Sequence, residues 1–471
     1  DVVAGRWSRW MGLMWSLGVF LVLAGQACVA MYPPPEVVID LDAPASDRWL
    51  TSVQTVIHEH GFDKSFGEVF ASHNQSLYQY VDDTAREKLA SKFAVLFPEN
   101  AEELRGMSKA FLDAGYYVSY EYLVGWVYFH ELAHTDWAHE SIQTQRSCSG
   151  ILVQGLDGGM VHGRNMDQNP QAAQKLTLQH TWVRNGSVVL ESVDWYWFTT
   201  GVVTALKPGV ASLQENWRLA PAVPHDDMMA ALLGGAVPQV LLFRRTLLED
   251  SESLTAVVSS IASAELAAPC YFIAAGAGER AGAVITRWPL DKSDVHWMGQ
   301  NATNTSVHDG GWFMVQTNYD SWLPDPAQDA RATRAAAALR SLGPTRAGSA
   351  LGVYAVLQSY PVGNGATVYS AVMTHDVGRA AKKPAAAAAA AGGAEKAGRQ
   401  PGTTAAGPAF ALAADAGAVV VGAVAGAAVS AAAAAVEAAP AAGRAVAPAA
   451  AATAAVAPEA GSIAASAAAS A

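Results

Sequence analysis

The chain has few cysteines for its size. Only three of its 471 residues are cysteine, namely Cys28, Cys148 and Cys270. Cys28 lies in an N-terminal segment with the features of a cleaved leader, which leaves two for the body of the protein. Two cysteines cannot form the framework of a disulfide-built scaffold. We expect Cys270 to be a small buried residue in a strand, whereas a free thiol in an oxidising compartment raises the question of reactivity.

Basic residues are also scarce. Lys and Arg number 30 against 42 Asp and Glu, and the formal net charge is −12. Proteins that bind nucleic acid need a basic surface to neutralise phosphates. The composition therefore argues against a nucleic-acid partner.

Aromatic residues nearly vanish from the last part of the chain. Residues 379–471 consist largely of alanine, with Gly, Val, Pro, Ser and Thr making up most of the remainder. Such a segment buries too little apolar surface to build a core, so we expect it to be disordered. Its uncharged stretch at 416–436 has side chains too small to predict insertion into a membrane. The folded part must lie upstream.

The N-terminal apolar run is too short to cross a bilayer. It follows two arginines, extends from Met11 to Gly25, and leads to the small residues Ala27-Cys28-Val29-Ala30. A membrane-spanning helix needs about 20 apolar residues. We predict a secretory signal peptide over 1–30, with an uncleaved anchor as the alternative. Four glycosylation sequons fit a glycoprotein of the secretory pathway: Asn74, Asn185, Asn301 and Asn304.

Hydrophobic periodicity divides the body of the chain near Cys148. After a short strand at 37–41, apolar residues at three- and four-residue spacing predict four helices: 47–60, 82–96, 101–114 and 121–139. Downstream, β-rich runs separated by turns predict strands at 148–154, 159–166, 178–184, 187–197, 202–205, 211–215, 271–275, 283–287, 312–317, 353–359 and 367–373. Helices are predicted among them at 226–249, 254–266 and 327–342.

One candidate site is the motif H-E-x-x-H at 130–134. On a helix, His130 and His134 would share a face and could bind zinc, while Glu131 acts as a general base. The extension typical of metzincins is missing, because Trp137 and Glu140 occupy the positions of its Gly and third His. The alternative is a partly exposed helix that carries two histidines.

A second candidate site begins at Cys148, the first residue of a predicted strand. Arg164 lies near the end of the next predicted strand and Asp167 directly follows it, and the glycine-rich turn at 155–159 joins the two strands. An antiparallel hairpin would return both residues to the neighbourhood of the cysteine. A cation beside a thiol lowers its pKa, and a carboxylate can orient an amine or a guanidinium group. The pattern predicts a reactive cysteine.

The segment resembles the N-acylethanolamine acid amidase and acid ceramidase family of N-terminal-nucleophile hydrolases. A precursor in that family cleaves itself before a Cys, and the signature combines Cys-Thr-Ser-Ile/Val with His-Gly-Arg-Asn-Leu/Met-Asp. Here Cys148-Ser149-Gly150-Ile151 and the residues from His162 to Asp167 match it. Further similar segments lie at 32–49, 194–215, 278–287, 312–320, 329–333 and 367–373.

Three departures from the family pattern bear on self-cleavage. Ser149-Gly150 stands where the family has Thr-Ser, and extra residues at 135–146 separate the preceding helix from Cys148. Ser147 is smaller than the large apolar residue common before the scissile bond. The family also has an apolar stretch with a Glu where this chain has the two histidines of 130–134, which disposes of much of the zinc hypothesis.

The resemblance implies an α+β fold, the αββα sandwich of two packed antiparallel sheets, with a mostly helical N-terminal α subunit. It implies four parts: a signal peptide at 1–30, a helical α-subunit region at 31–147, a catalytic β subunit at 148–378 and the tail at 379–471. Cleavage between Ser147 and Cys148 would leave the two chains as a heterodimer.

The resemblance also implies an activity, the hydrolysis of an N-acylethanolamine or ceramide-like lipid to a fatty acid and an amine. Cys148 would be the nucleophile, its freed α-amino group the base, and Asn318 with backbone donors the oxyanion site. The implied catalytic residues are Cys148, Arg164, Asp167, Glu215, Asn318 and Arg331. No cofactor and no metal are expected, and the implied location is a lysosome, another acidic compartment, or outside the cell.

Two alternatives remain at this stage. The chain could be a zinc metalloprotease that uses His130, Glu131 and His134, or a non-catalytic lipid-binding relative. Aromatic and apolar residues of the upstream helices could shape an acyl groove or make peripheral contact with a membrane, although they also suit core packing: Phe66, Val69, Phe70, Trp126, Tyr128 and Phe129.

Overall fold

The fold is available from a computed structural model of the chain. It describes residues 33–135, 148–156, 158–219, 222–249, 251–290, 292–299 and 309–375, and the backbone of 419–422; the side chains of 75–80 are not described. The predicted signal peptide, Ser147 and most of the tail therefore lie outside the described residues.

Two β-sheets form the centre of the molecule. The larger has the order β1-β4-β5-β6-β7-β8-β9-β10 and the smaller β11-β2-β3-β12-β13. β1 pairs parallel with β4, and every other pairing between described strands is antiparallel. The larger sheet comprises β1 Glu36–Asp40, β4 Leu178–Arg184, β5 Ser187–Asp194, β6 Thr204–Lys207, β7 Ala211–Trp217, β8 Cys270–Gly276, β9 Gly282–Arg287 and β10 Ser293–Trp297. The smaller comprises β11 Phe313–Gln316, β2 Ser149–Gln154, β3 Met160–Asp167, β12 Thr367–Thr374 and β13 Val419–Gly422.

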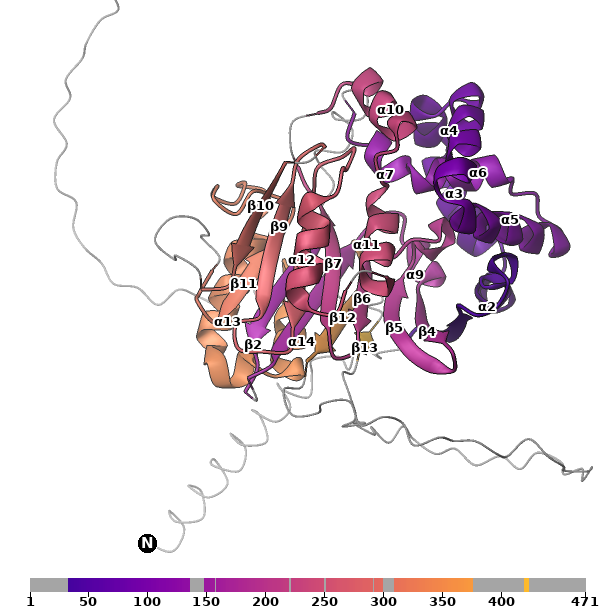
Figure 1. Cartoon of the computed structure of the whole chain (residues 1–471). Coiled ribbons are helices and arrows are strands. Elements are labelled where there is room, and N and C mark those ends of the chain that lie inside the picture. The colour runs from indigo at the N-terminus through magenta and orange to yellow at the C-terminus, as the bar shows by residue number, and fades with distance from the viewer. Residues whose placement is uncertain are drawn as a thin grey trace, which may run out of the picture.

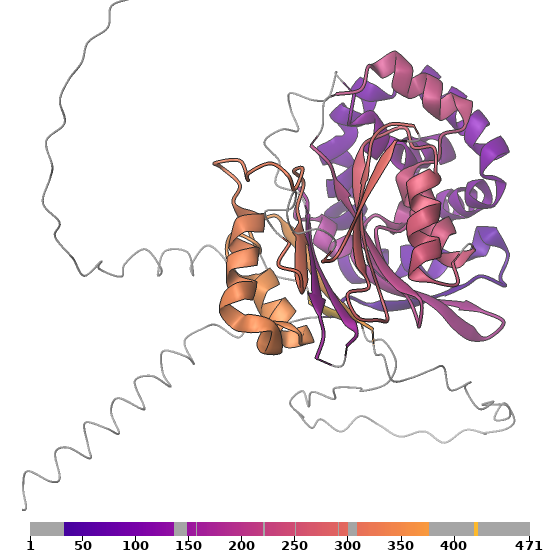
Figure 2. The ribbon, with the colours of Figure 1, turned by 60° about the vertical axis from the view of Figure 1, so that its left-hand side comes forward.

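The sheets pack face to face with helices on their outer faces (Figures 1 and 2). Leu152 and Met160 of the smaller sheet meet Tyr271 and Ile273 of the larger in a buried apolar cluster. The larger sheet is covered by α11 Gln239–Leu248 and α12 Leu254–Ser263, and the smaller by α13 Arg331–Ala347 and α14 Ala350–Gln358. The predicted αββα sandwich is confirmed by this layering.

The upstream region forms a separate layer of helices beside β4 and β5 (Figure 1). Its elements are η1 Ala45–Asp47, α2 Leu50–His60, η2 Asp63–Gly67, α3 Glu68–Tyr80, α4 Asp83–Leu96, α5 Pro98–Asp113, α6 Tyr120–Val127 and α7 Phe129–Leu132. The short helices η3 Trp197–Thr199, α9 Ala173–Leu176 and α10 His225–Gly234 belong to the downstream part. Strand β1 extends the larger sheet, so the upstream region shares the sheet of the downstream part.

A buried ion pair joins the two parts. Both carboxylate oxygens of Glu103 on α5 accept from Arg244 on α11, at 2.5 and 2.7 Å. Glu103 also accepts from Arg48 Nη1 at 2.9 Å and from Trp49 Nε1 at 3.0 Å. The buried carboxylate of Glu103 is thus fully paired. Removing one of its partners would leave a buried charge without full compensation.

Several predicted elements differ from the structure. Residues 353–359, expected as a strand, lie largely in helix α14, because Ser349 caps its N-terminus by accepting from Gly352 N at 3.0 Å and Val353, Val356 and Leu357 form one buried face. The helix expected at 226–249 is divided into α10 and α11, since Gly235 adopts a φ of 112° before Pro238. α3 and β10 were missed.

The part of the tail that the structure describes forms a strand, which the sequence did not predict. Residues 419–422 pair antiparallel with β12, from Ser370↔Gly422 to Met373↔Val419. The segment contains three valines, a β-branched residue that favours strands, and it covers the otherwise open edge of the smaller sheet.

The aromatic residues that could have shaped an acyl groove pack mainly in the core. Phe66, Val69, Trp126 and Tyr128 are fully buried and Phe70 is 8% exposed. Only Phe129 is partly buried. A cavity of about 660 Å³ lies on this region, lined by Phe62, Phe70, Tyr117 and Tyr122 among others. Within the ranges that the structure describes, no helix is long and apolar enough to span a membrane.

Candidate active site

Cys148 lies at the start of β2, in the middle of the smaller sheet. β2 and β3 form the predicted hairpin, with Ser149 opposite Asn165 and Gly150 opposite Arg164. Gly155 N closes the turn by donating to Gly159 O at 2.6 Å. Since antiparallel pairing fixes the register, Arg164 returns to the cysteine.

The thiol is buried beside a guanidinium group. Arg164 Nη2 donates to Cys148 Sγ at 3.2 Å, and Met166 Sδ lies 3.4 Å from the same sulfur. Arg164 is held by Thr204 Oγ1 at 2.7 Å and by the carbonyl of Val203. Burial raises the pKa of the Cys148 thiol, and Arg164 lowers it by less. The expected cation is present, but the expected net lowering of the pKa is wrong because desolvation outweighs it.

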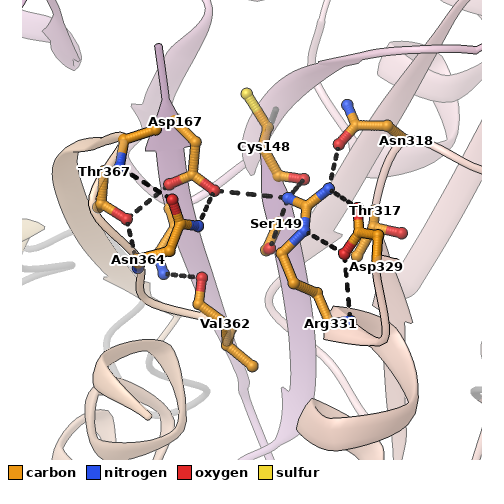
Figure 3. Close-up of polar contacts among 12 residues, drawn as sticks. Cys148, Ser149, Asp167, Thr317, Asn318, Asp329, Arg331, Val362, Asn364 and Thr367 are labelled. Atoms are coloured by element: carbon orange, nitrogen blue, oxygen red, sulfur yellow. Dashed lines mark hydrogen bonds and ion pairs between the residues drawn. The ribbon is translucent and has the colours of Figure 1, made fainter. Parts of the chain in front are cut away.

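Arg331, at the first turn of α13, joins the groups around Cys148 (Figure 3). Its Nη1 donates to the Cys148 carbonyl at 3.1 Å and lies 3.4 Å from Asp167 Oδ2. Its Nη2 donates to Asn318 Oδ1 at 2.9 Å, and Asp329 accepts from its Nε and Nη2 at 2.8 and 2.7 Å. The buried guanidinium of Arg331 thus fixes the positions of the Cys148 backbone, Asn318 and Asp167 relative to one another.

Asp167 ends β3 and is fully paired. Thr367 Oγ1 donates to its Oδ1 at 2.6 Å, and Asn364 Nδ2 donates to its Oδ2 at 2.8 Å. Burial raises the pKa of this carboxyl, while Arg331 and the two hydrogen bonds lower it by less. The residue acts structurally as a clamp between β3 and the loop before β12.

Asn318 follows β11, and its amide is oriented from both sides. Its Nδ2 donates to the carbonyl of Trp217 at 2.8 Å, while its Oδ1 accepts from Arg331. Figure 3 shows the Asn318 amide nitrogen and the Cys148 sulfur pointing away from Arg331 in the same direction. A primary amide has two N–H groups, and an N–H held in this orientation suits an oxyanion.

Glu215 on β7 is buried close to Arg164. Its backbone N donates at 3.1 Å to the carbonyl of Val203, which also accepts from Arg164. The Glu215 charge raises the pKa of the Cys148 thiol, in addition to burial. Its Oε1 lies 3.5 Å from Nε2 of His130 on α7.

The histidine motif at 130–134 does not form the candidate zinc site in the described structure. α7 ends at Leu132, and the His134 ring lies flat on Trp217 with centroids 3.6 Å apart. Glu131 Oε1 accepts from Gln239 N at 2.8 Å, and burial raises the pKa of its carboxyl. Within the described part of the chain, no group of three or more His, Cys, Asp or Glu could hold a metal ion. Glu131 and His134 are buried and His130 is partly buried, whereas the alternative expected a partly exposed helix.

No protein-family model matches the chain, but several known proteins are similar to it in sequence. It is 34% identical to the N-acylethanolamine-hydrolyzing acid amidase of Rattus norvegicus over 236 residues, which is 48% of this chain and 60% of the rat protein. Identity to the Caenorhabditis elegans amidase is 29% over 364 residues, 76% of this chain and 94% of that protein. Identity to human acid ceramidase is 29% over 241 residues, or 59% of its length.

The chain is a homologue of the N-acylethanolamine acid amidases and acid ceramidases. A solved structure of a C. elegans N-acylethanolamine-hydrolyzing acid amidase orthologue aligns with a TM-score of 0.42 at 28% identity, covering 48% of this chain and 92% of that one.

In this homologue of the acid amidases, the structure brings together most residues that the resemblance selected. Cys148, Arg164, Asp167, Asn318 and Arg331 are linked by direct contacts, and Glu215 adjoins them through Val203. Ser147 lies outside the described residues.

Three supporting residues were not predicted as part of the site. Asp329 was noted only as part of the similar segment at 329–333. Its ion pair with Arg331 could have been predicted, because the two residues are two positions apart at the start of a predicted helix. Asn364 contacts Asp167 from a loop with no motif, and Thr367 contacts it from the first position of β12, in the similar segment at 367–373. Cys270 is a fully buried strand residue, as expected, and it is a free thiol.

Proposed function

We propose that the chain is a cysteine amidase that cleaves itself before Cys148 and then hydrolyses the amide bond of N-acylated lipids. The observation that carries the proposal is the position of Cys148, whose sulfur contacts Arg164 and whose carbonyl is held by Arg331. The rat and nematode relatives hydrolyse N-acylethanolamines, as their names state. The human relative is a ceramidase, and the substrate class here is the shared N-acyl amide.

Maturation begins with attack of the Cys148 thiol on the carbonyl of Ser147. The peptide C–N bond breaks, a thioester to Ser147 forms, and the nitrogen of Cys148 becomes a free amine. Water then hydrolyses the thioester, which leaves a carboxylate on Ser147 and restores the thiol. Arg331 holds the carbonyl of Cys148 and lies close to Asp167 at the end of β3.

The new α-amino group then serves as the base for substrate turnover. An α-amine titrates near ~8 when unperturbed, and it can take the thiol proton and pass it to the leaving amine. This base offsets the raised pKa of the buried Cys148 thiol. Asn318 stabilises the oxyanion, a role worth about 3 kcal/mol for one donor. Water completes the cycle by hydrolysing the acyl-thioester to a fatty acid.

The cellular setting follows from the sequence. A signal peptide over 1–30 would direct the chain to the secretory pathway, and an acidic compartment or the exterior is its destination. Asn74 and Asn185 are exposed and accessible to glycosylation. The upstream and downstream chains would stay together as a heterodimer, and the upstream helices would contact lipid.

Substitution of the nucleophile tests this function. Cys148→Ala should give a single uncut chain without hydrolysis of N-acylethanolamine or ceramide, whereas wild type shows two chains on a denaturing gel. Cys270→Ala is the matched control, because Cys270 is a buried residue of β8 with no proposed role in catalysis. This variant should be cut into two chains and should be active. An uncut wild-type chain that binds N-acyl lipid without hydrolysing it would identify a non-catalytic lipid-binding relative instead.

A further inference from the structure

His130 and His134 lie in a segment that is apolar in the family that the sequence resembles. His130 lies close to Glu215. His130 Nε2 lies 3.5 Å from Glu215 Oε1, with side chains 13% and 6% exposed. Among the described residues, both ring nitrogens of His130 and Glu215 Oε1 form no hydrogen bond. Buried polar atoms are rarely left in this state. The two groups therefore face each other, and the carboxylate of Glu131 is a further charge close to both.

The imidazole is held in place by its surroundings. The His130 ring meets Trp217 edge-on with centroids 4.6 Å apart, and it lies 5.1 Å from the ring of His134. His134 in turn stacks on Trp217. Trp217 is two residues after Glu215 on β7, and alternate strand residues share a face. The packing thus fixes His130 over the carboxylate.

Glu215 stands close enough to the nucleophile for its charge to matter. Its carboxylate opposes ionisation of the Cys148 thiol, and Arg164 favours it. A hydrogen bond from His130 would draw the charge of Glu215 toward α7 and fix the direction of the carboxylate. Such an effect changes the chemical step more than the binding of substrate.

We propose that His130 is a positioning residue for the amidase reaction: its Nε2 donates to Glu215 and holds that carboxylate in the orientation that catalysis requires. This inference rests on the proposed function. His130 lies upstream of the predicted cleavage site and Glu215 downstream of it. The upstream chain would therefore supply a residue to the active site of the downstream chain.

A double-mutant cycle tests the coupling, with kcat and KM measured on a fluorogenic N-acyl amide. His130→Phe should lower kcat about tenfold while KM stays within about twofold, because a contact of 1–2 kcal/mol is lost in the chemical step. Glu215→Gln should lower kcat as well, and the double variant should be no slower than Glu215→Gln alone. Losses that multiply in the double variant would show that His130 acts independently of Glu215 and would overturn the proposal.

Two polar substitutions keep the test valid if the aromatic variant does not fold. His130→Gln retains an N–H that can reach Glu215 and should keep most of the wild-type kcat. His130→Asn is too short and should resemble His130→Phe. Equal kcat values for the Gln and Asn variants would contradict the proposal. His58→Phe is the matched control, because His58 is an exposed residue of α2.

The Cys148→Ala variant separates failure of the inference from failure of the function. If Cys148→Ala hydrolyses the amide, the proposed function is wrong. If Cys148→Ala is inactive and the His130 and Glu215 losses multiply, only the positioning role is wrong.

Discussion

At the scale of single residues, Arg331 sets the geometry around Cys148. Its guanidinium contacts the Cys148 carbonyl, Asn318 and Asp329 at once and lies close to Asp167. A planar group with five donors can serve these partners, whereas the single ammonium of lysine cannot. If this residue changed, Asp329 would lose its hydrogen bonds to the guanidinium group, and Asp167 would lose its nearby cation.

Arg331→Lys should therefore lower stability by about 2–4 kcal/mol and reduce kcat by at least about tenfold. Urea unfolding and steady-state kinetics on an N-acyl amide measure the two effects. Arg334→Lys, an exposed position in the same turn of α13, should change neither. Wild-type stability and activity in Arg331→Lys would show that the network is dispensable.

Single residues also show what the sequence could and could not predict. The proximity of Cys148 and Arg164 follows from a hairpin, whose register a short turn fixes. Asn364 contacts Asp167 across 197 residues, and no local pattern marks it. The raised pKa of the Cys148 thiol was also unpredictable, because desolvation depends on how deeply the three-dimensional fold buries the sulfur.

At the scale of elements, β1 and α2 attach the upstream region to the downstream sheet. His180 on β4 lies fully buried with its Nε2 3.1 Å from Ser52 Oγ on α2. Burial lowers the pKa of His180 to about 3, so the ring stays neutral in the folded protein. This contact depends on a neutral histidine at the junction of the two parts.

The pH dependence of stability should reflect this histidine. An unfolded His titrates near 6.5, so unfolding takes up a proton between pH 6.5 and about 3, and the stability from His180 is present above pH 6.5 and lost as the pH falls. His180→Gln should be less stable than wild type at pH 8. The difference should shrink by about 1.4 kcal/mol per pH unit below 6.5.

Urea unfolding of both proteins from pH 8 to pH 4.5 measures this difference. His58→Gln, at an exposed position of α2, should follow the wild-type profile. Parallel pH profiles for wild type and His180→Gln would contradict a neutral buried role for His180.

Element boundaries show where periodicity is ambiguous. The strands β4, β9 and β12 could be predicted closely, because short β-branched runs between turns have few alternatives. The run at 353–359 is equally apolar, and only the cap at Ser349 and the spacing of Val353, Val356 and Leu357 reveal the helix. The strand at 419–422 was not expected because it lies in the alanine-rich tail, and only the open edge of β12 selects it.

At the scale of the whole molecule, no disulfide joins the two parts within the ranges that the structure describes. Cys148 and Cys270 are free thiols, and the contacts between the parts include the β1–β4 pairing, the Ser52–His180 contact and the buried Glu103–Arg244 pair. After cleavage, gel filtration should therefore recover both chains in one peak, with or without reductant. Separation by reductant alone would contradict this arrangement.

The most direct test of the central claim is N-terminal sequencing of the two chains, separated in denaturant from the purified mature protein. The account predicts one chain that begins near residue 31 and a second that begins at Cys148, and it predicts no second chain in Cys148→Ala. A single intact chain in active wild-type protein, or a second chain that starts at another residue, would contradict the assignment of Cys148 as an N-terminal nucleophile.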